Sequence, residues 1–455
     1  MKKVALHNLG CKVNAYETEA MQEMLEKEGY EIVPFKEGAD VYIINTCTVT
    51  NIADRKSRQM LHRARKMNPD AIVVAAGCYV QAQENEHHEL DSCIDIVIGN
   101  NKKQDLLRIL TDYEAKRKAE KNGLEETQME ELNEETDETQ TKEVIDINHT
   151  KEYENLNLSR TGEHTRAYIK VQDGCNQFCS YCIIPFARGR VRSRSLEDVV
   201  QEVTALSENG YKEVVLTGIH LSSYGIDFDE EGKKTELLSL ILAVHEIPGI
   251  ERIRLGSLEP RIITEEFAKT IASLPKMCPH FHLSLQSGCD ATLKRMNRRY
   301  TSAEYFEKCE LLRKYFEHPA LTTDVIVGFP GETEEEFEES KAFVDKVNFY
   351  ETHIFKYSKR EGTRAAVMEN QVPEQVKAKR SAELIALGEK KQEAYEKAMV
   401  GREVEILVEE PAVIDGKEVQ VGHTKEYIKV ALKSEKNLQN QIVKIQIDDH
   451  SQIIH

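Results

Sequence analysis

Three cysteines in one short run carry the clearest chemical signal in this sequence of 455 residues. Cys175, Cys179 and Cys182 follow the spacing Cys-x3-Cys-x2-Cys. Such a run can place three thiolates on three irons of a cubane cluster. Because iron–sulfur clusters normally take four cysteine ligands, a trio without a matching fourth predicts an iron with an open coordination position. An open position allows a metal centre to bind a substrate or cofactor.

A structural metal site is the alternative for this run. Zinc sites more often show paired Cys-x2-Cys elements, and a bacterial ferredoxin spaces its first three cysteines by two residues each. The gap of three residues between Cys175 and Cys179 fits neither pattern. We therefore favour a reactive cluster.

Three further cysteines occupy equivalent places in the first part of the chain. Cys11, Cys47 and Cys78 each come just after an apolar segment that we predict to be a strand, at 3–7, 41–45 and 71–76. Open α/β sheets build their sites at the carboxyl edge of their strands. We expect the three thiolates to converge there and to hold a second cluster, again with an open iron. For any single cysteine, the alternative is a small buried apolar side chain.

The elements that position these cysteines predict an α/β protein. Strands alternating with helices over residues 1–115 favour a doubly wound parallel domain. Residues 161–390 contain six strand candidates separated by five helices, which favours a partial (β/α)6 barrel because right-handed crossovers wind a parallel sheet into a cylinder. Short strands at close spacing in residues 391–455 favour a small antiparallel β-barrel.

Residues 116–160 are predicted to be an acidic linker. The stretch 120–154 has 13 acidic and 3 basic residues and accounts for −10 of the net charge of −18. A segment so charged and so poor in apolar residues is typical of solvated chain, so local basic patches matter more than the total charge. No apolar run approaches the ~20 residues of a membrane span. We expect a cytoplasmic protein with no membrane partner.

Polar and glycine residues collect at the carboxyl ends of the predicted barrel strands, which is the functional face of such a fold. These candidate cofactor-binding residues are Thr217, Gly218, Ser257, Glu259, Gln286, Gly328 and Gly331.

With both trios placed, the chain resembles the methylthiotransferases, radical S-adenosylmethionine enzymes with an amino-terminal auxiliary cluster. The resemblance covers essentially the whole chain, including a terminal domain like the TRAM nucleic-acid module. The segments 9–14 (LGCKVN) and 45–50 (NTCTVT) look most like the branch that modifies N6-threonylcarbamoyladenosine beside the tRNA anticodon.

The resemblance implies two [4Fe-4S] clusters, with Cys11, Cys47 and Cys78 holding the auxiliary cluster and Cys175, Cys179 and Cys182 the radical cluster. It further implies S-adenosyl-L-methionine as cofactor, the tRNA anticodon stem-loop as substrate, and an electron donor such as flavodoxin or ferredoxin. The implied reaction adds a methylthio group to C2 of the modified adenosine by a radical mechanism.

Three alternatives remain at this stage. Within the family they are methylthiolation of a ribosomal-protein aspartate or of isopentenyl-adenosine in tRNA. Outside it, the alternative is a structural zinc-containing RNA-binding protein.

Basic side chains near the cysteine loops are candidate contacts to RNA phosphates. Solvated surface charge is the alternative for each group. In the terminal barrel, Tyr427 is the one obvious aromatic platform for a base. The candidate arginines are Arg55, Arg58, Arg188, Arg190, Arg192, Arg298 and Arg299.

Overall fold

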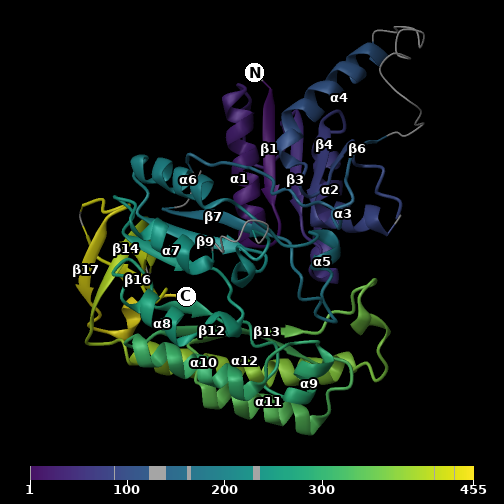
Figure 1. Ribbon diagram of the computed structural model, residues 1–455. Coiled ribbons are helices and arrows are strands. Elements are labelled where there is room, and N and C mark those ends of the chain that lie inside the picture. Colours follow the sequence, from purple (N-terminus) through teal and green to yellow (C-terminus); the bar gives the residue numbers. More distant parts are fainter. Residues whose placement is uncertain are drawn as a thin grey trace. The chain divides into compact units, whose positions relative to one another are not determined.

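The computed structural model describes residues 2–86, 88–121, 140–160, 165–228, 236–414, 416–434 and 436–455 (Figure 1). The chain forms two compact units. Unit 1 comprises Met1–Leu158 together with Asp173–Asn176 and Cys182–Arg192, and unit 2 comprises Ser159–Gln172, Gln177–Tyr181 and Ser193–His455. Each unit is described separately below.

Unit 1 is built on a six-stranded parallel sheet with the order β2-β1-β3-β4-β5-β6. Strands β3 and β4 are buried at every residue, as expected for strands covered on both faces. The strands are β1 (Lys3–Asn8), β2 (Glu31–Ile32), β3 (Val41–Thr46), β4 (Ile72–Gly77), β5 (Ile96–Ile98) and β6 (Thr141–Glu143).

Helices cover both faces of this sheet, so the predicted doubly wound domain is confirmed (Figure 1). The helices are α1 (Lys12–Lys27), α2 (Asn51–Met67), α3 (Cys78–Asn85) and α4 (Leu106–Lys121). Apolar side chains of α1 and α4 pack on one face, and those of α2 and α3 pack on the other. Helix α2 starts where the Thr50 hydroxyl accepts a hydrogen bond from the Ala53 N–H, which satisfies one of its free backbone donors.

The predicted linker at 116–160 needs correction at both ends. Helix α4 continues to Lys121, and Thr141–Glu143 form the edge strand β6, paired in parallel with β5. The sequence Thr-Lys-Glu lacks the apolar alternation that would have indicated a strand, because an edge strand can keep its side chains partly exposed. The most acidic part of the linker, 122–139, lies outside the described residues.

Unit 2 contains the predicted partial barrel. Strands β7, β9 and β10 pair in parallel, as do β11, β12 and β13. The two sets are joined by the bridge between Leu258 and Leu283, which gives six parallel strands in succession. The strands are β7 (Arg166–Asp173), β8 (Arg192–Ser193), β9 (Glu213–Gly218), β10 (Arg252–Leu255), β11 (His280–His282), β12 (Ala320–Val327) and β13 (Glu351–Lys356).

The helices between these strands bury the main apolar core of unit 2 against the sheet. Helices α10 and α11 each begin with a capping box, at Thr301/Glu304 and Thr333/Glu336. In each box the threonine side chain accepts from the backbone N–H of the glutamate, and the glutamate side chain accepts from the backbone N–H of the threonine. The helices after α4 are α5 (Ile184–Ala187), α6 (Leu196–Glu208), α7 (Leu237–His245), α8 (Glu265–Ala272), α9 (Asp290–Arg295), α10 (Ser302–Tyr315), α11 (Glu334–Val347) and α12 (Glu374–Lys397).

The last strands form an antiparallel sheet with the order β16-β15-β14-β17 and their own apolar cluster. They are β14 (Glu403–Ile414), β15 (Lys417–Thr424), β16 (Lys429–Leu432) and β17 (Ile442–Gln446). Among the helices that the structure describes, none combines the length and the apolar character needed to cross a bilayer.

Candidate cluster sites

Cys11, Cys47 and Cys78 lie at the carboxyl edge of three adjacent strands. Cys11 caps α1 after β1, Cys47 follows β3, and Cys78 is the first residue of α3 after β4. The register pairs Asn8 with Asn45 and Thr46 with Gly77, so the three strands end level with one another. The topology therefore brings together three thiols that are far apart in sequence.

Hydrogen bonds from side chains to the backbone hold the loops of Cys11 and Cys47 in place. The Asn14 amide donates to the carbonyls of Leu9 and Thr46, at 2.7 and 3.0 Å, and so ties the loop of Cys11 to that of Cys47. The Ser57 hydroxyl accepts from the Cys47 N–H at 3.2 Å and donates to its carbonyl at 3.0 Å. Preceding Cys11, Gly10 has φ +110°, and a Cβ there would lie 3.0 Å from the Cys47 Sγ.

The thiols are close enough to affect each other electrostatically. Burial raises the pKa of Cys47 to about 12, and the neighbouring Cys78 and Cys11 thiols add to the increase. The pKa of Cys11 is also raised, first by desolvation of its sulfur and further by the Cys78 thiol, although the residue as a whole is exposed. Because only a thiolate ligates metal, a bound metal must displace these protons.

The donor set fits an iron–sulfur cluster better than a single zinc ion. Tetrahedral zinc with Zn–S bonds of about 2.3 Å draws its sulfurs to about 4 Å from one another. Within the described part of the chain, ligating atoms lie within 4.8 Å of one another in two groups, His62/Asp91/Cys93 and His282/Asp324/His353. Neither group includes this trio, so its three sulfurs do not all lie as close together as the ligands of a single zinc ion would.

The surroundings of the trio also suit an anionic cluster. The Arg188 Nε–H points to the Cys78 Sγ at 3.1 Å, and the Asn100 amide nitrogen lies 3.6 Å from the same sulfur. Both groups are fully buried. Donors held against a cysteine sulfur stabilise its thiolate, and hydrogen bonds to cluster sulfurs are one way that proteins tune such centres.

The two ends of the 175–182 run belong to unit 1, where the backbone fixes Cys175. Its N–H donates to the Gly189 carbonyl at 3.0 Å. Gly174 before it has φ +70°, and a Cβ there would lie 1.8 Å from the Arg190 carbonyl oxygen, so no larger residue fits.

The middle of the run belongs to unit 2 and is held by the segment that follows α9. The Asn297 amide donates to the Phe178 carbonyl at 2.9 Å, and the Ser180 N–H donates to the Met296 carbonyl at 3.0 Å. The Arg298 Nη1 lies 3.2 Å from the Cys179 Sγ. Phe178 adopts a positive φ of 50°, which these contacts stabilise.

Three members of the predicted cofactor-binding set, Thr217, Gly218 and Glu259, lie at or just after the ends of β9 and β10. Thr217 is buried at the end of β9, and a Cβ on Gly218 would lie 2.8 Å from the Gln172 side-chain oxygen. That oxygen accepts from the His220 N–H at 2.7 Å. Glu259 forms a bidentate ion pair with Arg261, with contacts of 2.6 and 3.0 Å.

The other predicted members have varied surroundings. Ser257 is exposed, whereas Gln286 is buried with φ 68°. The Gly328 N–H donates to the Glu332 carboxylate at 2.9 Å, and a Cβ on Gly328 would lie 2.3 Å from the Lys377 side chain of α12. Gly331 donates to the Asn370 carbonyl at 2.9 Å. The two glycines therefore shape a tight turn packed against α12, and their part in cofactor binding stays a prediction.

Two of the predicted RNA-binding arginines need correction. Arg188 and Arg192 are fully buried, and Arg188 binds carboxylates and a cysteine of unit 1. Arg298 is partly buried and contacts Cys179, and its part in RNA binding stays a prediction. A phosphate in solvent has no access to Arg188 or Arg192. Arg55, Arg58, Arg190 and Arg299 are exposed and stay candidates.

Tyr427 is not a free stacking platform. Its ring lies against His280 and His423, with centroid separations of 5.0 and 4.6 Å, and the guanidinium groups of Arg166 and Arg254 lie 4.9 and 4.7 Å from its centroid. The ring is therefore occupied by contacts between the barrel and the terminal sheet.

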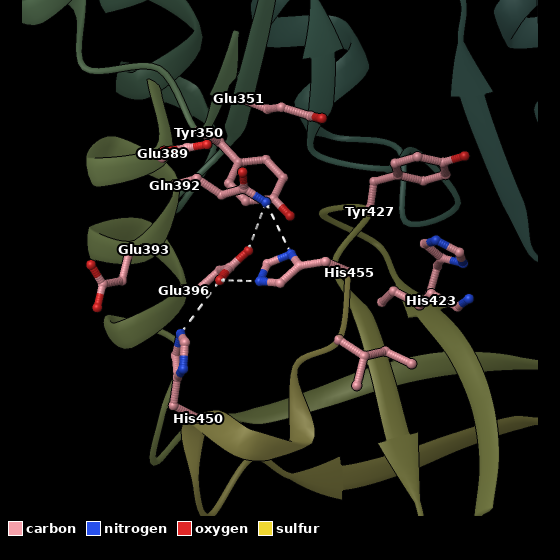
Figure 2. A pocket seen from close by; sticks show the side chains of 12 residues that line it. Tyr350, Glu351, Glu389, Gln392, Glu393, Glu396, His423, Tyr427, His450 and His455 are labelled. Carbon is pink, nitrogen blue, oxygen red and sulfur yellow. Dashed lines mark hydrogen bonds and ion pairs between the residues drawn. The ribbon is translucent and has the colours of Figure 1, made fainter. Parts of the chain in front are cut away.

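A cavity of about 670 Å³ lies between α12 and the terminal sheet (Figure 2). It is lined by four carboxylates, those of Glu351, Glu389, Glu393 and Glu396, and by a single lysine, Lys429. Figure 2 shows His450 and His455 turned toward Glu396, with ion-pair distances of 3.4 and 3.6 Å. So many carboxylates would repel the RNA backbone, so this cavity does not fit a phosphate-binding site.

Several residues at the two sites escaped the sequence-based prediction. His220 and Tyr300 lie beside Glu259 and Arg298, and Asn100 and Lys103 lie beside the auxiliary trio. The position of His220 just after the Thr217-Gly218 strand end could have indicated it. The other three lie outside any motif, and only the fold brings them to the sites.

Family models match both parts of the chain that carry cysteines. A model described as the radical SAM superfamily matches residues 169–344, and one described as uncharacterized protein family UPF0004 matches residues 3–99. Among solved structures, the radical S-adenosylmethionine methyltransferase TsrM from Kitasatospora setae aligns with a TM-score of 0.55 at 16% identity, covering 81% of this chain and 74% of that one. This likeness concerns the fold.

Curated relatives match over nearly the full length. Threonylcarbamoyladenosine tRNA methylthiotransferase MtaB of Bacillus subtilis is 40% identical over 98% of this chain and 94% of its own. The protein of the same name from Aquifex aeolicus is 40% identical over 89% and 92%. The tRNA-2-methylthio-N(6)-dimethylallyladenosine synthase of Acetivibrio thermocellus is 33% identical over 98% and 88%. This chain belongs to the methylthiotransferase family of radical S-adenosylmethionine enzymes.

Proposed function

We propose that this chain adds a methylthio group to C2 of N6-threonylcarbamoyladenosine beside the anticodon of tRNA. The observation that carries the proposal is the convergence of Cys11, Cys47 and Cys78 at one edge of the unit 1 sheet, in a chain that also has the 175–182 run. The substrate assignment is supported by four relatives with that substrate in their names, at 35–40% identity.

The proposal requires S-adenosyl-L-methionine and two [4Fe-4S] clusters, one on each cysteine trio. When bound, they would supply a 5′-deoxyadenosyl radical and the sulfur to be transferred. The protein residues hold and shield these groups. Asn14 fixes the loops of Cys11 and Cys47, and Arg298 and Asn297 fix the loop of Cys179. Burial shields the thiols of Cys47 and Cys78 from water, whereas Cys11 is exposed.

The remaining assignments follow from this role. Arg55, Arg58, Arg190 and Arg299 would contact phosphates of the anticodon stem-loop. A flavodoxin or ferredoxin would supply the electron, and the reaction would take place in the cytoplasm.

Replacing one cysteine of each trio tests the division of labour. Cys175→Ala should abolish both cleavage of S-adenosylmethionine and formation of product. Cys47→Ala should retain cleavage, measured as 5′-deoxyadenosine, but form no methylthiolated nucleoside. Equal loss of cleavage in both variants, with the radical cluster still present in Cys47→Ala, would refute this division.

The substrate is tested by mass spectrometry of nucleosides after reaction with anticodon stem-loops. One stem-loop carries N6-threonylcarbamoyladenosine, and a matched one carries isopentenyl-adenosine. The proposal predicts the 2-methylthio product from the first alone. If only the stem-loop with isopentenyl-adenosine gives product, this chain has instead the function named for the Acetivibrio thermocellus relative.

A further inference from the structure

Arg188 is fully buried in unit 1 and directs its guanidinium at four partners. Its Nε–H donates to the Cys78 Sγ at 3.1 Å. Its Nη1 contacts Glu17 at 2.8 Å and both oxygens of Asp173 at 3.1 Å, and its Nη2 donates to the Asn14 side-chain oxygen at 2.7 Å and to Glu17 at 3.1 Å. The planar fork of an arginine suits such a fixed set of acceptors.

The partners of Arg188 belong to a larger buried network. Lys103 pairs with Glu17 at 3.1 Å and donates to the Asn100 side-chain oxygen at 2.8 Å. The Asn100 amide nitrogen then faces the Cys78 Sγ at 3.6 Å. Cys78 therefore has two N–H groups directed at its sulfur, one charged and one neutral.

The charges described for this buried network do not cancel, because its cations outnumber its carboxylates. Three buried cations, Arg188, Lys103 and Arg192, surround two buried carboxylates, Glu17 and Asp173. An unbalanced positive charge in a protein interior is costly. A cluster with thiolate ligands carries negative charge and would balance it.

Arg188 also links the auxiliary site to the radical run within unit 1. It directly follows α5, which begins two residues after Cys182. Its partner Asp173 ends β7, two residues before Cys175, and Cys175 donates its N–H to the carbonyl of Gly189. The segment that carries two radical-cluster cysteines thus delivers a hydrogen-bond donor to the auxiliary trio.

We propose that Arg188 is a positioning residue of the auxiliary cluster, whose Nε–H holds the Cys78 sulfur and raises the reduction potential of that cluster. The inference rests on the proposed function, because it requires the second cluster. Hydrogen bonds to cluster sulfurs stabilise the more negative reduced state. The effect is strong in a buried site, where the low dielectric strengthens hydrogen bonds.

The test is an anaerobic redox titration of the full-length, reconstituted protein, followed by electron paramagnetic resonance. The auxiliary signal is the one that disappears in Cys47→Ala. Arg188→Lys keeps the positive charge but removes the Nε–H and the fork. In this variant the equilibrium constant for reduction of the auxiliary cluster should fall about tenfold, which lowers its midpoint potential by about 59 mV for one electron. The midpoint potential of the radical cluster should not change.

Two further variants separate hydrogen bonding from charge and from loss of folding. Asn100→Ala removes the neutral N–H and should shift the auxiliary midpoint in the same direction by less, with all buried charges intact. Glu17→Gln adds one unit of net positive charge without touching the sulfur and should raise the midpoint. Arg192→Lys is the matched control, since the contacts described for its side chain are Asp173 and the Arg190 carbonyl, and its auxiliary midpoint should equal that of the wild type.

Unchanged auxiliary midpoints in both Arg188→Lys and Asn100→Ala would overturn the inference while leaving the proposed function intact. Absence of a second cluster signal from the wild-type protein would overturn both. If Arg188→Lys does not fold, the Asn100→Ala midpoint decides.

Discussion

The Nη1 of Arg298 lies 3.2 Å from the Sγ of Cys179, the middle cysteine of the 175–182 run. The same guanidinium lies 4.9 Å from the centroid of the Tyr300 ring, and its Nε donates to the Tyr300 hydroxyl at 3.0 Å. The single hydroxyl proton of Tyr300 has two acceptors within reach, the carbonyls of Ser284 at 2.7 Å and Leu285 at 2.8 Å. A charged donor is thus fixed against the Cys179 sulfur by contacts that reach the segment just after β11.

Replacing Arg298 should impair the radical cluster. Arg298→Gln removes the charged N–H at Cys179, and loss of a partner that orients a metal ligand costs about 10- to 100-fold in affinity or activity. We expect such a loss in the rate of 5′-deoxyadenosine formation, measured without tRNA. Arg299→Gln, at the exposed neighbouring residue, should retain the wild-type rate in this assay. Equal rates in all three proteins would show that the Arg298 contact does not matter for cleavage.

If the exposed arginines contact RNA phosphates, they should make the affinity for RNA depend more steeply on salt concentration. Each phosphate contact contributes about 0.7–0.9 to the slope of log affinity against log salt concentration. Replacing Arg55, Arg58, Arg190 and Arg299 together by glutamine should flatten the slope by about 3, measured by fluorescence anisotropy with a labelled anticodon stem-loop. Lys118→Gln is the control. Lys118 lines a cavity with Lys2 and Ile72 at the edge of the sheet where the strands begin, which is opposite to the edge that carries the cysteines. An unchanged slope in the fourfold variant would exclude these arginines from the interface.

Glu213 should be essential for the stability of unit 2. It is 1% exposed and faces three arginines, with Arg254 at 2.9 Å, Arg252 at 3.6 Å and Arg166 at 3.9 Å. Although burial opposes its charge, these arginines hold the pKa of its carboxyl below the usual value. Glu213→Gln leaves buried cations without their shared partner, which costs about 3–5 kcal/mol in the free energy of unfolding. Urea unfolding of the full chain measures this loss.

The control for Glu213 is an exposed ion pair. Glu338 on α11 pairs with Lys341 at 3.3 Å, and its side chain is 53% exposed. Glu338→Gln should therefore cost about 1 kcal/mol or less. Similar losses for the two variants would mean that the Glu213 cluster contributes no more than surface charges do.

His220 should make stability depend on pH. Burial lowers the pKa of His220 to about 4, against the usual value near 6.5. As the pH falls below about 6.5, the unfolded chain binds a proton that the folded state does not, so stability is lost progressively until about pH 4. The thermal midpoint should therefore fall between pH 7.5 and pH 5 by more in the wild type than in His220→Gln. The same fall in both proteins would contradict this role of His220.

The cysteine trios could be predicted because each depends on a simple rule. The 175–182 run needs only local spacing. Cys11, Cys47 and Cys78 need only the fact that parallel strands end at one edge, and β1, β3 and β4 follow that rule. The strand and helix order of the barrel was likewise predictable, because the apolar segments alternate clearly with amphipathic ones.

The arginines could not be assigned from sequence because charge does not reveal burial. Arg188, Arg190 and Arg192 alternate in sequence, yet Arg190 is exposed while the other two are buried. The partners Glu17 and Asp173 that stabilise the buried charge of Arg188 lie 171 and 15 residues away. A pattern of basic residues near a catalytic loop therefore indicates either RNA binding or support of a metal site, and only tertiary contacts distinguish the two.

The most direct test of the two-cluster account is iron and sulfide analysis with Mössbauer spectroscopy after anaerobic reconstitution. The account predicts about eight irons per wild-type chain as two cubanes of four. It predicts about four in a variant with Cys11, Cys47 and Cys78 all replaced by alanine, with S-adenosylmethionine still cleaved. About four irons in the wild type, unchanged in this triple variant, would contradict the account.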